Sequence, residues 1–202
     1  ARAGGEPALL AALALDIARE YAVDSERVYV AGLSAGAAMA VILGATYPDV
    51  FAAVGSHSGL PYRAAHDVPS AFAAMGGRSV ATAPIGAVPA RRSGAVTPLI
   101  VFQGDRDKTV APSNADTLVK QAIGEAAVVA PNTHGSESEG AGRGYTRSTY
   151  TTARGDVVVE FWQIHGAGHA WSGGSADGTY TDPQGPDASA EMVRFFLQIN
   201  AG

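Results

Sequence analysis

The segment RVYVAGLSAGAAMA, residues 27–40, places a serine between two glycines where a strand pattern gives way to a helix pattern. The β-branched and aromatic residues of 27–31 predict a strand, and the alanine-rich run 35–47 predicts a helix that ends before a proline. Gly-x-Ser-x-Gly between these elements is typical of a sharp turn that holds a nucleophilic serine above a sheet edge. Because a chain with 25 glycines also produces this pattern by chance, the interpretation depends on the flanking elements.

The turn predicts roles for four residues. Ser34 is expected to be a nucleophile, and the N–H of Ala35, at the start of the following helix, is expected to stabilise an oxyanion. Glycine is expected to be required at positions 32 and 36, because a side chain at either position would collide with neighbouring backbone.

The rest of the chain alternates between strand and helix patterns. Apolar runs predict strands over 51–55, 99–103, 145–152 and 157–164, and apolar periodicity predicts helices over 7–21, 113–123 and 187–200. The residues expected on one apolar face of the first helix are Leu10, Leu13, Ala14, Ile17 and Tyr21. Apolar strands that are separated by helices predict an α/β fold with a mostly parallel sheet and helices on both faces. Residues 61–97 and 131–144 are expected to be loops or insertions.

Composition excludes several classes of protein. With a net charge of −5 and 16% charged residues, the chain has no basic stripe for nucleic acid. A hydrophobic fraction of 47% excludes a disordered chain. No apolar run reaches the roughly 18 residues that a membrane-spanning helix requires. The absence of cysteine excludes disulfides, thiolate metal sites and a cysteine nucleophile.

A second informative segment is LIVFQGDRDKTV, residues 99–110. A predicted buried strand ends here in a glycine, and two acidic residues follow in the loop. Asp107 is the expected catalytic carboxylate because it lies three residues after the glycine, with Val110 three residues further on. Asp105 is then a turn residue or a partner of Arg106, although both aspartates are also compatible with a solvated turn.

The third segment, FWQIHGAGHAW (residues 161–171), carries two histidines in a glycine-rich loop after a strand. His169 is the expected general base, because it lies beyond the strand on a loop that glycines allow to approach the serine. His165 is expected to cap the strand end and to bond a backbone group. The pair lacks the glutamate and the helix of a zinc motif, so we do not expect it to bind zinc. Hydrolysis through a serine, an aspartate and a histidine needs neither a metal ion nor an organic cofactor, so we expect neither.

The chain order Ser34, Asp107, His169 is that of α/β-hydrolases, whereas other serine hydrolases use different orders. The segment VGSHSGLPY, residues 54–62, follows a predicted strand and is expected at the same sheet edge. His57 and Tyr62 are either substrate-pocket residues or ordinary loop residues. The residue Trp171 is either a pocket wall or is buried beneath its loop.

Four segments of the chain resemble the poly(3-hydroxybutyrate) depolymerase family of esterases. They are GLSAGAAMA (32–40), VGSHSGLPY (54–62), VFQGDRDKTVAPSNAD (101–116) and HGAGHAWSGG (165–174). The resemblance extends from Gly4 to the C-terminus. It implies an α/β-hydrolase that cleaves carboxylic esters, polymeric or small and including feruloyl and acetyl esters, through Ser34, Asp107 and His169. It also implies a protein secreted to the periplasm or the cell exterior, with neither nucleic acid nor a membrane as partner.

The chain departs from this family at its front. Only 33 residues precede Ser34, enough for one helix and one strand, and the C-terminal residues cannot replace the missing strands. We therefore expect residues 1–202 to be a single, N-terminally incomplete domain, the C-terminal portion of the full fold. A second oxyanion donor and the remaining strands would come from an N-terminal fragment or a dimer partner. Two alternatives stay open: a serine peptidase of the same fold, and a catalytically inactive binding module.

Overall fold

The computed structural model describes residues 4–78, 97–124, 132–136 and 142–199. The strands are β1 (Tyr29–Leu33), β2 (Ala53–His57), β3 (Leu99–Gly104), β4 (Asn132–Ser136), β5 (Tyr145–Thr151), β6 (Val157–Ile164), β7 (Trp171–Ser172) and β8 (Thr181–Asp182). The helices are α1 (Gly5–Glu20), α2 (Ala35–Thr46), α3 (Val68–Met75), α4 (Ser113–Ile123) and α5 (Ala188–Gln198). A short 3₁₀ turn, Ser25–Arg27, precedes β1.

Within the described part of the chain, six strands form one sheet in the order β1-β2-β3-β6-β5-β4. Strands β1, β2, β3 and β6 are mutually parallel, whereas β5 and β4 are antiparallel additions beside β6. The predicted mostly parallel α/β sheet is therefore confirmed. Because parallel strands end at the same edge, the segments that follow β1, β2, β3 and β6 gather there.

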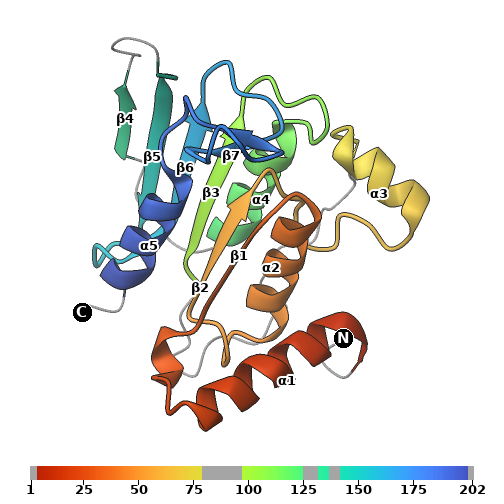
Figure 1. Cartoon of the computed structure of the whole chain (residues 1–202), viewed down its shortest axis with the longest axis vertical. Coiled ribbons are helices and arrows are strands. Elements are labelled where there is room, and N and C mark those ends of the chain that lie inside the picture. Colours follow the sequence, from red (N-terminus) through yellow and green to blue (C-terminus); the bar gives the residue numbers. More distant parts are fainter. Residues whose placement is uncertain (1–3, 79–96, 125–131, 137–141, 200–202) are drawn as a thin grey trace.

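Helices cover both faces of this sheet (Figure 1). On one face, α2 and α4 pack against β2, β3 and β6 through a core that includes Val41, Val101 and Leu118. On the other face, α5 packs Met192 and Phe195 against the opposite side of the same strands. Asp187 caps α5 by accepting a hydrogen bond from the Ala190 N–H, as expected of an aspartate before a helix.

Two segments predicted to be loops contain regular structure. Within 131–144, β4 pairs in antiparallel register with β5, because backbone hydrogen bonds stabilise an edge strand whose polar sequence gives no apolar alternation. Within 61–97, α3 begins with a capping box in which Asp67 and Ser70 exchange hydrogen bonds. The prediction for 79–96 lies outside the described residues.

The predicted apolar face of α1 is correct only at Leu10 and Ala14. The side that packs against the end of α2 carries Ala8, Leu10, Ala11 and Ala14. Leu13 and Tyr21 instead point to solvent, with exposed fractions of 53% and 69%. Small residues permit close approach to α2, so the helix buries its alanine-rich side. None of the helices in the described ranges is long and apolar enough to cross a bilayer.

Candidate active site

Ser34 occupies a strained turn between β1 and α2. Its backbone has φ 58° and ψ −118°, a conformation that residues other than glycine rarely adopt. Such a conformation costs on the order of 1–3 kcal/mol and persists where the surrounding structure enforces it. The Ser34 N–H donates to the His57 carbonyl at 2.9 Å, which ties this turn to the end of β2.

The two glycines of the turn differ. A Cβ atom on Gly32 would lie 2.3 Å from the carbonyl carbon of Gly36, so glycine is required at position 32. A Cβ atom on Gly36 would meet nothing within 4 Å, so the expected collision at that position is wrong. The helix α2 begins at Ala35, and its first N–H groups have no partner inside the helix. Residue Ala35 is exposed, and its N–H, in the first turn of α2, has no acceptor within the helix.

Asp107 is buried in the loop after β3. One carboxylate oxygen, Oδ1, accepts the N–H groups of Thr109 and Val110, both at 2.9 Å. Burial alone would raise the pKa of Asp107, but these bonds and the bond from His169 outweigh it and lower that pKa below its ordinary value. Asp107 is therefore a carboxylate held in one orientation.

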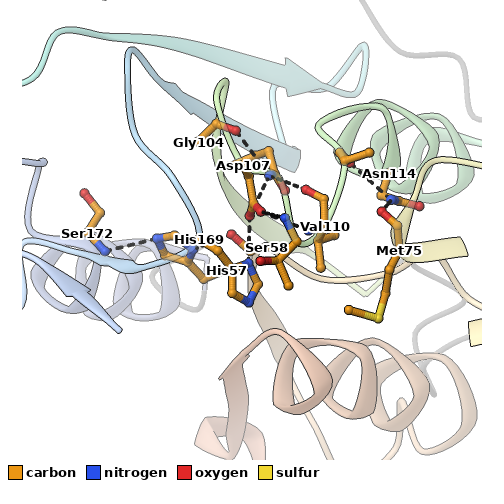
Figure 2. Close-up of polar contacts among 12 residues, drawn as sticks. His57, Ser58, Met75, Gly104, Asp107, Val110, Asn114, His169 and Ser172 are labelled. Atoms are coloured by element: carbon orange, nitrogen blue, oxygen red, sulfur yellow. Dashed lines mark hydrogen bonds and ion pairs between the residues drawn. The ribbon is translucent and has the colours of Figure 1, made fainter. Parts of the chain in front are cut away.

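His169 contacts the other oxygen of this carboxylate. Its Nδ1 lies 2.8 Å from Asp107 Oδ2, and the short dashed contact at the centre of Figure 2 joins the two side chains. With the proton on Nδ1 donated to the carboxylate, Nε2 is left as a base. Among the residues that the structure describes, no hydrogen bond joins His169 to the Ser34 hydroxyl. Such bonds are often long before substrate binds.

Three contacts fix the loop that carries His169. The Gly166 N–H donates to Asp105 Oδ1 at 2.7 Å, and the Arg106 N–H donates to the Ala167 carbonyl at 3.0 Å. Asp105 lies in a turn, as one of the two predicted alternatives has it, and its side chain also holds the histidine loop. His165 Nε2 lies 2.9 Å from the Thr146 hydroxyl, where a backbone partner was expected.

The three expected pocket residues have different environments. His57 is buried at 1% exposure, and both ring nitrogens contact protein groups, so neither nitrogen is open to a substrate. Tyr62 is half-buried, and its backbone N–H and carbonyl bond the Gln121 amide on α4 at 2.9 and 3.1 Å. Trp171 is half-buried, and its indole N–H donates to the Ser189 hydroxyl at 3.1 Å.

Two residues near the site were not predicted. Gln103 donates from Nε2 to Asp107 Oδ2 at 3.3 Å and to the Val110 carbonyl at 3.2 Å. Its signal in the sequence is a single amide at the end of an apolar strand. Arg143 pairs with Asp182 and donates to the Gly166 carbonyl at 2.9 Å, but no sequence motif marks it. Within the described ranges, no cluster of His, Asp and Glu is arranged to hold a metal ion.

The chain is similar to a described protein family and to several known proteins. A family model described as esterase PHB depolymerase matches residues 1–144. The sequence is 31% identical to a poly(3-hydroxyalkanoate) depolymerase C of Paucimonas lemoignei, over 98% of this chain and 47% of that protein. It is 32% identical to a poly(3-hydroxybutyrate) depolymerase of Ralstonia pickettii, over 77% of this chain and 32% of that protein.

A solved structure shows the same fold. An acetyl xylan esterase from Aspergillus awamori superposes with a TM-score of 0.65 at 24% identity, covering 82% of this chain and 62% of that one. The chain spans less than half the length of either curated relative, at 47% and 32%.

Proposed function

The chain belongs to the esterase PHB depolymerase family, and from that premise we propose that it is a serine hydrolase of carboxylic esters. The observation that carries the proposal is the 2.8 Å contact between Asp107 and His169, at the sheet edge where Ser34 occupies its strained turn. A carboxylate, an imidazole and a serine in this arrangement are the groups that acyl transfer requires.

In the proposed reaction, Ser34 Oγ attacks the ester carbonyl while His169 Nε2 takes the serine proton. Asp107 keeps the imidazole in the required tautomer and stabilises the imidazolium that forms. The imidazolium then gives its proton to the leaving alcohol, and an acyl group remains on Ser34. Water, activated by the same histidine, releases the acid and restores the serine.

The developing oxyanion is stabilised by the Ala35 N–H at the N-terminus of α2. Hydrolases of this fold take a second N–H from a loop after an earlier strand. We assign that donor to a segment that pairs along the free side of β1, contributed by a further part of a longer protein or by a partner chain. Removing one such donor costs about 3–4 kcal/mol of transition-state stabilisation, so the second donor matters greatly for rate.

The substrate class follows from the relatives. Two are named as depolymerases of poly(3-hydroxyalkanoate) and poly(3-hydroxybutyrate), and a structural neighbour is named as an acetyl xylan esterase. We therefore propose an ester substrate, polymeric or small. Export from the cell is part of the same proposal and rests on the resemblance to secreted depolymerases.

Hydrolysis of a p-nitrophenyl short-chain ester tests the proposal. The wild-type protein is expected to hydrolyse it, and Ser34→Ala is expected to lose essentially all of this activity, by roughly 10⁶-fold in kcat. Ser25→Ala, in the exposed turn before β1, is the matched control and should retain wild-type activity. Activity that survives in Ser34→Ala would show that Ser34 is not the nucleophile.

A further inference from the structure

His57, the last residue of β2, has no part in the proposed chemistry, yet its side chain is almost completely buried. The imidazole stacks on Phe102 of β3, with ring centroids 5.7 Å apart, and on Trp171, with centroids 5.3 Å apart. Phe102 belongs to the sheet, whereas Trp171 follows the loop that carries His169. The ring therefore lies between the sheet and the segment of the general base.

The hydrogen bonds of this ring define its tautomer. The Ser172 backbone N–H can only donate, so His57 Nε2, 3.1 Å away, accepts and carries no proton. The ring proton is then on Nδ1, which donates to the Ser58 hydroxyl at 3.2 Å. Figure 2 shows the Ser172 contact beside the pair formed by Asp107 and His169.

The backbone of His57 makes the complementary link. Its carbonyl accepts the Ser34 N–H at 2.9 Å, at the turn that holds the nucleophile. One residue thus bonds the nucleophile turn through its carbonyl and the segment after His169 through its ring. These are two segments that must keep a fixed separation if Ser34 and His169 are to exchange a proton.

We propose that His57 is a positioning residue, which sets the distance between Ser34 and His169 by accepting the Ser172 N–H. The inference rests on the proposed esterase function. Loss of the Nε2 acceptor would leave the buried Ser172 N–H without a partner, and the segment would shift to find one. A misplacement of about 1 Å between reacting groups can cost on the order of 10²-fold in rate.

Two variants separate the hydrogen bond from the ring. His57→Phe keeps a stacked ring but has no acceptor, whereas His57→Gln can place its Oε1 near the position of Nε2. With a p-nitrophenyl ester, His57→Phe is expected to lower kcat by roughly 10- to 100-fold with little change in KM, because substrate binding is untouched. His57→Gln is expected to recover most of that loss.

Each result decides the proposal. It is overturned if His57→Phe keeps the wild-type kcat, or if His57→Gln is as slow as His57→Phe. Should His57→Phe fail to fold by circular dichroism, His57→Leu, which also lacks an acceptor for the Ser172 N–H, takes its place, and its kcat must fall with KM unchanged. A wild-type protein that neither hydrolyses the ester nor reacts with a fluorophosphonate probe would instead overturn the esterase function itself.

Discussion

The two sides of the candidate active site differ in how completely the chain surrounds them. On the acid–base side, where β3 and β6 end, every oxygen of the Asp107 carboxylate has a bonding partner and the His169 loop is held at several points. On the nucleophile side, β1 is the last strand of the sheet in the part of the chain that the structure describes, and Ala31 at its centre is exposed. The exposed apolar residues of neighbouring α1 and its C-cap are Leu9, Leu13, Leu15, Ile17 and Tyr21.

This difference indicates for which parts of the candidate site this chain supplies all the surrounding contacts. On the proposed acid–base side, the bonds that orient Asp107 and His169 all come from described residues of this chain. Parallel strands are ordinarily covered, and free sheet edges are ready to pair with further strands. We propose that a further segment pairs along β1 and covers the apolar side of α1, the same segment that brings the second oxyanion donor.

The largest expected effect on kcat comes from a substitution on the acid–base side. Asp107→Asn preserves shape but presents an amide to His169, which favours the wrong imidazole tautomer, and kcat is expected to fall by about 10⁴-fold. Asp105→Asn is the matched control, since its oxygen can still accept the Gly166 N–H, and it should remain within a few-fold of wild type. Steady-state kinetics on a p-nitrophenyl ester distinguish them. If Asp105→Asn is the slower variant, the carboxylate is misassigned.

The next effect tests the turn on the nucleophile side. Gly32→Ala would force a methyl group against the Gly36 backbone, and we expect a loss of roughly 3 kcal/mol or more in the free energy of unfolding. Gly36→Ala enters open space and should change this free energy by less than about 1 kcal/mol. Urea denaturation of the two variants provides the comparison. Equal losses would contradict the described geometry of the turn.

A pH effect links the two sides through His57. Burial, and less strongly the charge of His169, lowers its pKa from 6.5 to about 3, although Asp107 opposes this shift. Between these values the unfolded chain binds a proton that the folded chain does not, so the folded state loses stability as pH falls. From pH 7 to pH 5 this histidine should cost about 2 kcal/mol of unfolding free energy.

The matched variant for this effect is His57→Gln, which has no titrating group. Urea unfolding of both proteins at the two pH values should show the extra loss in the wild type alone. If the two proteins lose the same stability, His57 titrates normally and is not buried as described.

The smallest expected effect concerns the exposed side of α1. Leu13→Gln replaces a solvent-facing residue with a good helix former, so the free energy of unfolding should change by less than about 0.5 kcal/mol in a dilute solution of the chain alone. Leu10→Gln, on the packed side, is the destabilising comparison. If Leu13→Gln instead costs stability in a concentration-dependent way, a second copy of the chain covers this surface.

Local patterns in the sequence predicted most of the fold. The helix expected over 113–123 is α4 with the same bounds, and the strand expected over 157–164 is β6. The order of the strands and helices, with a glycine near the end of β1, β3 and β6, also predicted that the loops after these strands lie at one edge of the sheet. These features depend on periodicity and turn chemistry within a few residues, which a single sequence contains.

Features that depend on distant partners were predicted poorly. A polar edge strand such as β4 is stabilised by backbone pairing, which leaves no apolar pattern. His57 resembles a site residue in the sequence, but its burial depends on Phe102 and on Trp171, which lie far along the chain. The packed side of α1 likewise depends on what lies against it.

The central claim is that this chain brings Ser34 into reach of the base formed by His169 and Asp107. It is tested most directly by reaction with a fluorophosphonate probe, followed by mass-spectrometric mapping of the modified peptide. The account predicts a single modified residue, Ser34, and much slower modification in Asp107→Asn. Modification of another serine, none at Ser34, or equal rates in both proteins would contradict it.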